Sequence, residues 1–436
     1  MVERRRFYGT VSSPSFRMGG IPLPCKPVSI LEYEATIMKS AQDPVVIVGL
    51  ARTPIGNFQG ALSAVGGPKL GGAAIEAALS QAGVAPESVD DVIMGCVLPA
   101  GMGQAPARQA ALAGGIPMSV GATTINKMCG SGMRATMMAA DQLAAGSASI
   151  MVAGGLESMS NTPYLLDKAR GGYRLGNGKI YDHMFIDGLE DIIDQPGKLM
   201  GSFAEDTAER YQFTREQQDT FALTSLERAK TANEDGSFSD EIVPVTVKSR
   251  SGETIVRRDE LPFTAKIEKI PQLKPAFREG GTVTAANSSA ISDGAAAVVL
   301  MRESEAERRG LTPLARIVDY TTHSHESSWF TTAPIGAINK LFEKTGWSRD
   351  DVDLFEVNEA FAVVTMAAMK DIGIDHDRMN IHGGACALGH PVGASGARII
   401  ATLYYALAKN GLNRGVASLC IGGGEATAIG IERIAA

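Results

Sequence analysis

The chain has 436 residues, 44% hydrophobic and 20% charged, as expected of a folded, soluble protein with more than one structural unit. Its net charge of −7 argues against a nucleic-acid-binding protein, and no apolar run of about 18 residues predicts a membrane span. The five cysteines stand far apart without CxxC pairs, which argues against a disulfide framework or structural zinc site and favours a reducing compartment.

The first 42 residues lack a hydrophobic period and contain scattered arginines, serines and prolines. One interpretation is a mitochondrial transit segment, which is typically Arg- and Ser-rich. Glu3, Glu32 and Glu34 weaken that pattern, and Met38 begins a suitable chain of its own. We therefore favour a disordered tail or an upstream start codon, and we assign no role to Cys25, which lies in this stretch.

From residue 45 onward the pattern is that of an α/β protein. "VVIVG" (45–49) is a short, continuously apolar run, typical of a strand buried on both faces. "KLGGAAIEAALSQAGV" (69–84) predicts an Ala-rich helix that ends near Gly83. Two further strands are predicted, from "VDDVIMGCVL" (89–98) and from "SIMVAGGLESMS" (149–160), and the second of these carries glycines near its end.

Part of this pattern recurs in the last third of the chain. The motif S-G-x-R stands at 131–134 and again at 395–398, and each copy opens an Ala-rich helix followed by an apolar, glycine-containing strand. Because the order and type of the elements agree, we interpret the recurrence as a duplicated α/β unit rather than chance likeness between Ala/Gly-rich helices. Two packed copies would bring their strand ends to a shared cleft.

Between the copies, residues 161–282 differ in character. They include "RGGYRLGNGKIYDHMFIDGLEDIID" (170–194), rich in Gly, Tyr and Asp, the helical "REQQDTFALTSLERAKTA" (215–232) and the charged "KSRSGETIVRRDE" (248–260). An insertion of this length is not expected to be a single loop. We predict a lid or substrate-binding subdomain that carries an oligomerisation arm.

Cys129 has the surroundings that most suggest chemistry. It follows a β-branched run and leads into glycines and an Ala-rich helix. Residues 130–135 match the dinucleotide fingerprint G-x-G-x-x-A, but no acidic strand end follows about 20 residues later. The dipole and unpaired N–H groups of a helix N-terminus favour a thiolate, and small glycines let a substrate carbonyl approach backbone donors. Cys129 is therefore a candidate nucleophile.

A nucleophilic thiol needs a base, and six histidines are available. His390 is the best placed, because it stands in the corner "GGACALGHPVGASGAR" (383–398), near the position that corresponds to Cys129. The alternative is a turn histidine with local hydrogen bonds. Asn358 of "VNEAFA" stands at a strand end of the same half. Cys420 ends the strand "VASLC" and is either a structural core cysteine or exposed at the cleft beside the glycine turn that follows.

The motifs "NKMCGSGMRA", "GGLESMS", "EVNEAFA", "GGACALGHPVGASGAR" and "CIGGG" occur in that order. With them, residues 43–436 resemble the thiolase family, in particular its acetyl-CoA acetyltransferases. The resemblance implies two duplicated α/β halves, each with a mixed five-stranded sheet in a layered αβαβα arrangement, plus an inserted loop domain. The corresponding boundaries are a leader or disordered extension at 1–42, an N-terminal half at 43–160 and 283–315, a loop domain with CoA-binding and tetramerisation segments at 161–282, and a C-terminal half at 316–436.

The resemblance also implies roles for the candidate residues. Cys129 would accept the acyl group, and His390 would activate it and help to hold the thioester oxygen. Cys420 would remove or return the Cα proton of the second acetyl group. Asn358 would position a water that, with His390, stabilises the enolate oxygen. The N–H groups of Cys129 and Gly422 would hold the oxygen of the tetrahedral intermediate.

A further set would contact CoA or its acyl end by the same resemblance: Met200, Phe277, Ala285, Ser289, Phe330, Ala360 and Phe361. Leu199 stands where many short-chain members have His, and Phe330 where they often have Met; both positions bear on acyl chain length. Cys386 replaces a hydrophobic residue and is interpreted as packing. Glu425 also departs from the common pattern, and we expect no consequence of it.

The implied activity is the reversible Claisen condensation of two acetyl-CoA to acetoacetyl-CoA and CoA, through a Cys129 acyl-enzyme, with no cofactor and no metal. The nearest alternative is a degradative 3-ketoacyl-CoA thiolase of broader chain length. Remoter ones are a non-catalytic CoA- or lipid-binding protein of the same fold and a dinucleotide-dependent oxidoreductase. We expect a cytoplasmic homotetramer, a dimer of dimers bridged by an arm around 169–188, without nucleic-acid or membrane partners. Its location would be the mitochondrial matrix if residues 1–37 are a transit segment.

Overall fold

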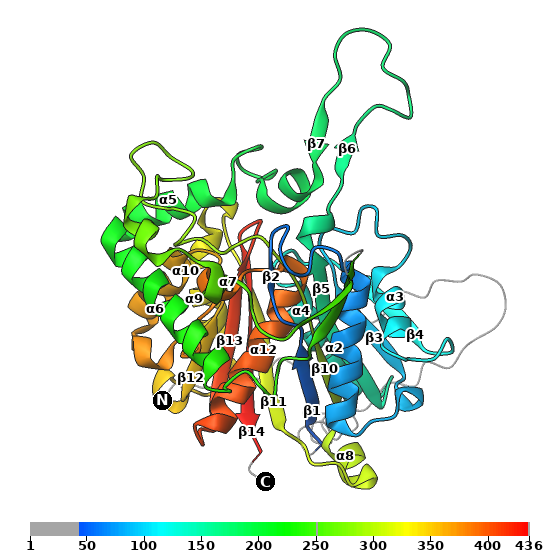
Figure 1. Cartoon of the computed structure of the whole chain (residues 1–436). Coiled ribbons are helices and arrows are strands. Elements are labelled where there is room, and N and C mark those ends of the chain that lie inside the picture. Colours follow the sequence, from blue (N-terminus) through cyan, green and yellow to red (C-terminus); the bar gives the residue numbers. More distant parts are fainter. Residues whose placement is uncertain (1–42, 250–251, 435–436) are drawn as a thin grey trace, which may run out of the picture. The chain divides into compact units, whose positions relative to one another are not determined.

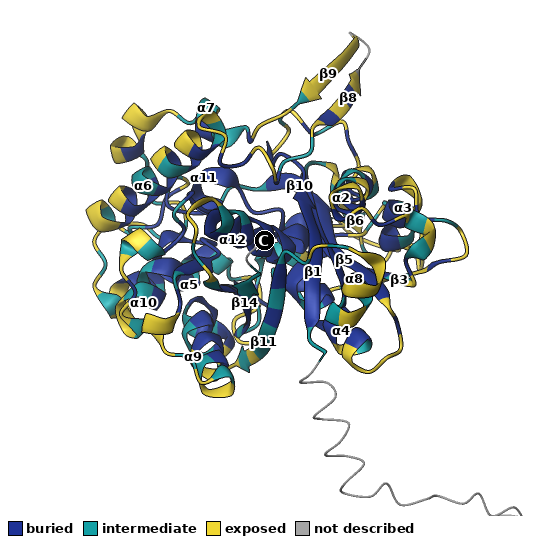
Figure 2. Ribbon diagram, turned by 90° about the horizontal axis from the view of Figure 1, so that it is seen from below, coloured by how far each residue is buried: buried dark blue, intermediate teal, exposed yellow. Residues whose placement is uncertain are grey.

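The computed structural model describes residues 43–249 and 252–434, so Cys25 and both interpretations of the N-terminal extension lie outside the described residues. Within the described part, helices and strands alternate in five layers, as the predicted αβαβα arrangement requires (Figure 1). One apolar core lies on each outer side, and a third surrounds two central helices. Figure 2 shows the buried strands of the interior in dark blue.

The first half contains five strands in the order β4-β3-β5-β10-β1. Their bounds are β1 Val45–Arg52, β3 Asp91–Gly95, β4 Gly121–Ile125, β5 Ile150–Ser158 and β10 Ser292–Arg302. β3 pairs in parallel with β4 and β5, whereas β10 is antiparallel to β5 and β1 and also pairs with the short β2 (Gly56–Asn57). β1 and β5 are buried throughout, as their apolar runs predict.

Two helices cover the outer face of this sheet, α2 (Gly67–Ala82) and α3 (Pro106–Ala113). The apolar residues of α2 pack on the sheet, and the helix ends at Gly83 with φ 64°, in the left-handed region that favours glycine. The predicted end of this helix is therefore confirmed.

The second half has four strands in the order β12-β13-β14-β11. They are β11 Ala315–Ser324, β12 Leu354–Val357, β13 Arg414–Ile421 and β14 Glu425–Arg433, with α9 (Ala333–Thr345) and α10 (Ala362–Ile372) on their outer face. The prediction of five strands in each half is wrong for this half of the described chain. Where the first half has β4, the second has a single parallel bridge between Phe355 and Met379. The next residue, Asn380, binds both backbone groups of Val357 through its side-chain amide, at 2.8 Å each, in place of a longer ladder.

The two halves meet in two places. β1 and β11 pair antiparallel through Val46–Arg316 and Ile47–Ala315, which joins both sheets into one. The central layer consists of α4 (Ser131–Ala144) and α12 (Val392–Lys409), which begin at or near the two S-G-x-R motifs.

The motif glycines allow these two helices to touch backbone to backbone. A Cβ added to Gly132 would lie 2.8 Å from the nitrogen of Ala397, and one added to Gly396 would lie 2.3 Å from the nitrogen of Met133. Since real Cβ atoms do not approach backbone this closely, glycine is required at both positions. The repeated motif therefore marks the helix crossing.

The predicted insertion contains helices and hairpins and is not a single loop. It contains the hairpins β6 (Tyr164–Leu166) with β7 (Ile180–Asp182) and β8 (Val245–Ser249) with β9 (Gly252–Val256), and the helices α5 (Met200–Tyr211), α6 (Arg215–Glu234) and α7 (Leu261–Thr264). α6 begins with a capping box in which Thr214 and Gln217 exchange hydrogen bonds. The β6–β7 hairpin projects away from the layered body (Figure 1).

The remaining elements are short. They are η1 Pro86–Ser88, η2 Met159–Asn161, η3 Phe185–Leu189, η4 Ile267–Gln272, α8 Glu303–Arg309, η5 Ser327–Thr332, η6 Arg349–Asp351, η7 His376–Arg378 and α11 Ala385–Leu388. Across residues 43–249 and 252–434, every helix is too short or too polar to cross a lipid bilayer.

Candidate active site

Cys129 lies in a tight corner between β4 and α4. Met128, just before it, has φ 48°, a left-handed conformation that is uncommon for a methionine. Ser131 holds the corner: its hydroxyl donates to the carbonyl of Met128 at 2.6 Å and accepts the N–H of Lys127 at 2.9 Å. The corner presents the Cys129 sulfur near the backbone N–H of Gly422, in the turn after β13.

The electrostatics of Cys129 differ from the expectation of a helix-stabilised thiolate. Burial raises the pKa of its thiol to about 11, against the opposing effect of the N–H groups of Gly422 and of Cys129 itself, while the charge of Glu157 adds to the rise. The prediction of a favoured thiolate is wrong for the free protein, because desolvation by distant parts of the chain outweighs the backbone donors. Cys129 therefore rests as a neutral thiol and needs a base.

Cys420 ends β13 beside Cys129 and is fully buried, so the exposure expected from its glycine turn is absent. Burial raises the pKa of its thiol well above the usual range, and the neighbouring Cys129 adds to the rise. The turn after it, Gly422 to Gly424, is held by the N–H of His325, which donates to the carbonyl of Gly424 at 2.8 Å. Both cysteines thus lie at one strand end.

The turn is also fastened to the Cys129 corner. Glu425, at the start of β14, forms an ion pair with Lys127. The pair links the segment that carries the nucleophile to the segment that carries the Gly422 N–H. Glu425 is thus a structural contact between the two sides of the site.

His390 stands between α11 and α12 and is almost fully buried. Its Nδ1 lies 2.6 Å from the hydroxyl of Ser395, which also donates to the carbonyl of Pro391. Its Nε2 is buried and has no hydrogen-bond partner among the described residues. Burial, with a smaller effect of the Arg398 charge, lowers the pKa of His390 to about 3, so the imidazole is neutral.

His390 belongs to the segment that packs against the Cys129 corner. Val392 and Cys129 belong to the same apolar cluster, and a Cβ on Gly132 would lie 3.1 Å from the carbonyl oxygen of Gly393. The predicted two-fold packing of the halves therefore brings the start of α12, just after His390, against the start of α4.

Asn358 follows β12 directly and is buried beside the end of β13, where its N–H donates to the carbonyl of Ser418 at 3.0 Å. Its side-chain oxygen accepts from Arg398 at 3.3 Å. Its Nδ2 is a second buried atom without a partner in the described part of the chain. Buried polar groups are normally hydrogen-bonded, so unpartnered groups in a reactive cluster suggest sites for a ligand or water.

An apolar cavity of about 630 Å³ lies next to this cluster. Five of the seven residues predicted to contact CoA line it: Met200, Phe277, Ala285, Ser289 and Phe361. Ala360 instead accepts the Ser289 N–H through its carbonyl, at 3.0 Å. Phe330 does not line the cavity; it is buried in the outer core with its ring edge-on to Phe203. Sequence reasoning missed other apolar lining residues, which come from separate segments: Phe58, Phe185, Leu189, Leu261 and Ile291.

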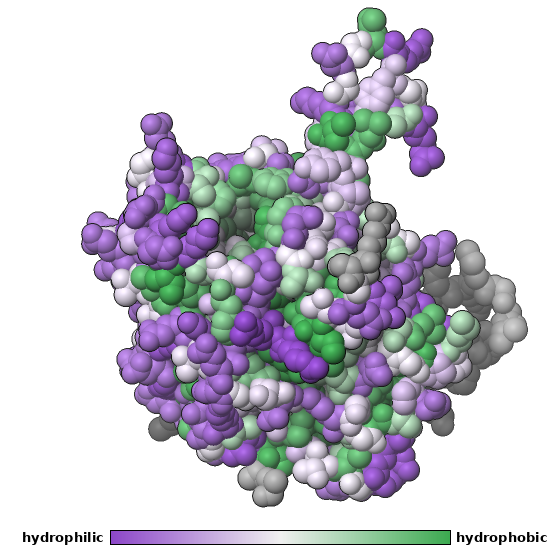
Figure 3. All heavy atoms as spheres, in the orientation of Figure 1, coloured by the Kyte–Doolittle hydropathy of each residue, from purple (hydrophilic) through white to green (hydrophobic). Residues whose placement is uncertain are grey.

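A smaller cavity of about 210 Å³ adjoins the glycine turn after β13, with Gly422, Gly423 and Met128 in its wall. Met200 lines both cavities and therefore lies between them. Figure 3 shows a hollowed, largely apolar surface between α5 and the base of the projecting hairpin. A separate cavity of about 750 Å³, lined by α2 and by Tyr404 and Tyr405 of α12, contains none of the candidate residues.

Glu157 is a buried carboxylate that sequence reasoning missed. It ends the apolar strand β5 and accepts the N–H groups of Val97, Leu98 and Gly393 at 2.8, 3.2 and 3.0 Å. Burial raises its pKa to about 7, against these three donors. By tying the loop after β3 to the start of α12, it supports the corner beneath Cys129. The sequence could have pointed to Glu157, because it is the one acidic residue in "VAGGLES", a stretch of otherwise apolar or small residues.

Across residues 43–249 and 252–434, no group of three or more His, Cys, Asp or Glu side chains is arranged to bind a metal ion.

Family models match almost the whole described chain. The model described as "Thiolase, N-terminal domain" matches residues 45–304, and that described as "Thiolase, C-terminal domain" matches residues 311–433. The chain belongs to the thiolase family.

Thiolase-family relatives agree with this assignment in sequence and in structure. An acetyl-CoA acetyltransferase of Rhizobium meliloti is 48% identical over 391 residues, which cover 89% of this chain and 99% of the relative. A protein of Mus musculus described as cytosolic acetyl-CoA acetyltransferase is 49% identical over 399 residues, which cover 91% of this chain and 100% of the relative. The crystal structure of the Bacillus anthracis acetyl-CoA acetyltransferase superposes with a TM-score of 0.87 at 44% identity. The match covers 90% of this chain and 99% of that structure's chain.

Proposed function

We propose that this thiolase-family acyltransferase is an acetyl-CoA C-acetyltransferase, which interconverts two acetyl-CoA with acetoacetyl-CoA and CoA. The observation that carries the proposal is the pairing of two thiols, the partly buried Cys129 and the buried Cys420, at one strand end beside the Gly422 N–H. One thiol to carry the acyl group and one to move a proton is what a two-stage condensation needs. The names of the relatives support the same activity.

In the first stage, the Cys129 sulfur attacks the thioester carbonyl of acetyl-CoA while its proton passes to Nε2 of His390. The tetrahedral oxyanion is held by the N–H groups of Cys129 and Gly422, and its collapse releases CoA, which takes the proton back. Because the thiol pKa is about 11 and that of His390 about 3, no thiolate–imidazolium pair exists beforehand. Proton transfer therefore accompanies the attack.

In the second stage, the thiol proton of Cys420 passes to Nε2 of His390, and the Cys420 thiolate accepts a Cα proton from a second acetyl-CoA. The developing enolate oxygen is stabilised by the protonated Nε2 of His390 and by a water on Nδ2 of Asn358, two of the buried atoms that have no partner in the described part of the chain. The enolate carbon then attacks the acyl carbon on Cys129, and the expelled Cys129 sulfur takes the proton from Nε2 of His390, which yields acetoacetyl-CoA and restores the free enzyme. No cofactor or metal enters this scheme.

The pantetheine arm of CoA would lie in the 630 Å³ cavity lined by Met200, Phe277 and Phe361, with Met200 between it and the smaller cavity beside the Gly422 turn. Its lining is mostly apolar, as an extended thioester arm requires.

A 3-ketoacyl-CoA thiolase of broader chain length is the second candidate. Leu199 makes the wall of the large cavity apolar where many short-chain members have His, and the 210 Å³ cavity beside Gly422 offers room for an acyl chain. Rates with acetoacetyl-CoA against 3-ketohexanoyl-CoA and longer substrates separate the two: a strong preference for acetoacetyl-CoA supports the acetyltransferase.

We further propose a cytoplasmic homotetramer, a dimer of dimers bridged by the β6–β7 hairpin. Tyr164, Leu166, Leu175 and Ile180 on this hairpin are exposed large hydrophobic residues. Such side chains on a projecting arm suit a contact with another subunit.

The decisive test of the activity is acyl transfer to Cys129. Radiolabelled acetyl-CoA should label the unaltered protein once per chain, at this residue. Cys129→Ala should abolish both labelling and turnover, and labelling that persists in the variant would overturn the nucleophile assignment.

A further inference from the structure

Arg398 is a buried charge that the scheme above does not use. It is the arginine of the second S-G-x-R motif, and its side chain is only 2% exposed. Its counterpart in the first motif, Arg134, is partly exposed. A charge is costly to bury unless it is paired and hydrogen-bonded, so the partners of Arg398 indicate what the charge is for.

One partner is the Asn358 amide. Nη2 of Arg398 donates to Oδ1 of Asn358 at 3.3 Å, and Nη1 donates to a carboxylate oxygen of Glu356 at 2.8 Å. A guanidinium carries only hydrogen-bond donors, so the Asn358 amide can bind to it in one orientation alone, with the amide oxygen toward the guanidinium. A flipped amide would set NH₂ against NH₂. Arg398 therefore decides that the unpartnered Nδ2 of Asn358 points the other way.

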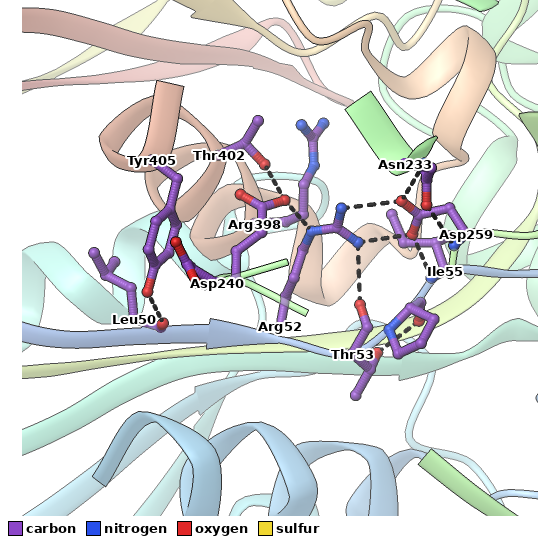
Figure 4. Close-up of polar contacts among 12 residues, drawn as sticks. Leu50, Arg52, Thr53, Ile55, Asn233, Asp240, Asp259, Arg398, Thr402 and Tyr405 are labelled. Atoms are coloured by element: carbon purple, nitrogen blue, oxygen red, sulfur yellow. Dashed lines mark hydrogen bonds and ion pairs between the residues drawn. The ribbon is translucent and has the colours of Figure 1, made fainter. Parts of the chain in front are cut away.

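The guanidinium is held by Glu356, and the helix that carries it makes a separate buried contact one turn later. Glu356 belongs to β12, two residues before Asn358, and Thr402, one turn after Arg398 on α12, hydrogen-bonds to Glu241 of the insertion at 3.3 Å. Glu241 also pairs with the buried Arg52, which binds Asp259 through both carboxylate oxygens at 2.7 and 3.0 Å (Figure 4). Buried contacts therefore link the insertion to α12, and α12 to the end of β12.

We propose that Arg398 is a positioning residue for the condensation stage: by holding the Asn358 amide through its oxygen, it aims Nδ2 at the water that stabilises the enolate. The inference rests on the proposed function. Arg398 does not touch the substrate, and the first stage uses the N–H groups of Cys129 and Gly422 instead of Asn358. Loss of Arg398 should therefore separate the two stages.

The test compares both stages in the full chain for Arg398→Met, with Arg134→Met as the matched control. Condensation, and exchange of the acetyl-CoA methyl protons with deuterated solvent, should fall by about 10- to 10²-fold, up to the loss seen when one stabilising donor is removed. Labelling of Cys129 by radiolabelled acetyl-CoA should stay near that of the unaltered protein. Arg134→Met should change neither.

A double-substitution cycle distinguishes positioning from general support of the fold. If Arg398 acts through Asn358, then Arg398→Met should cost nothing further in a protein that already carries Asn358→Ala. Multiplied losses in the double variant, or equal losses in labelling and condensation by a folded Arg398→Met protein, would overturn the proposal.

If the Arg398→Met variant does not fold, Arg398→Lys takes its place in the test. A lysine keeps the charge but lacks the planar fork that reaches Glu356 and Asn358 together. It should label normally and condense at an intermediate rate, and a Lys variant that condenses like the unaltered protein would refute the role of the fork. Failure of the proposed function would be seen separately, as an unaltered protein that neither labels at Cys129 nor condenses acetyl-CoA.

Discussion

Replacing Gly396 by alanine tests whether the helix crossing sets the geometry of the site. The new Cβ would lie 2.3 Å from the nitrogen of Met133, where ordinary contacts begin at 3.4 Å, so α4 and α12 must separate by about 1 Å. Because the obstructing atom belongs to the backbone, it cannot rotate away. Overpacking of this kind costs about 1–3 kcal/mol, offset by up to about 1 kcal/mol of better helix propensity. The free energy of unfolding should fall by about 1–2 kcal/mol.

Activity should fall further than stability. The helix N-termini that separate follow Cys129 and His390, and a displacement of about 1 Å can cost about 10²-fold in rate. Denaturant unfolding and steady-state thiolysis of acetoacetyl-CoA measure the two effects. Gly132→Ala, with its Cβ at 2.8 Å from the nitrogen of Ala397, should be milder. Gly66→Ala is the control, since its nearest atom lies at 4.0 Å. The reasoning is refuted if Gly396→Ala matches Gly66→Ala in both measurements.

Three further predictions concern the reactive thiols and the projecting hairpin. Cys420→Ser should still accept an acetyl group on Cys129 but lose about 10²–10⁴-fold in condensation and methyl-proton exchange, because a hydroxyl is a far weaker acid than a thiol; loss of acyl-enzyme with intact exchange would reverse the two roles. Alkylation of Cys129 by iodoacetamide should accelerate steadily from pH 7 toward its pKa of about 11, since only the thiolate reacts, whereas a plateau from pH 6 would reveal a preformed ion pair. Deletion of residues 171–187 should leave dimers in light scattering, and a full-length protein that runs as a monomer would contradict the proposed tetramer.

The sequence predicted those features that local patterns determine. The strand–helix alternation, the end of α2 at Gly83 and the second S-G-x-R corner follow from periodicity, glycine and repetition, and all are present in the structure. Cys129, Cys420 and Gly422 were found because each stands in a short motif that the structure brings to one strand end.

Features that depend on distant contacts were predicted poorly. The helix start near Cys129 suggested a low thiol pKa, but burial by other segments reverses its direction. The shortened sheet of the second half depends on one side-chain amide, that of Asn380, which no strand pattern reveals. Glu157 and the apolar residues that complete the large cavity come from separate segments, so only the folded chain shows what they share.

The central position of α12 has a consequence for synthesis of the chain. This helix packs against strands of the first half as well as the second, and its apolar residues belong to the core shared by both sheets. Until Val392–Lys409 has left the ribosome, the apolar surface that the first sheet and α4 present to α12 therefore stays exposed to solvent. Nascent chains and products of premature termination upstream of Val392 should therefore bind chaperones and aggregate when released. A chain that extends through β14 contains α12, which covers this apolar surface.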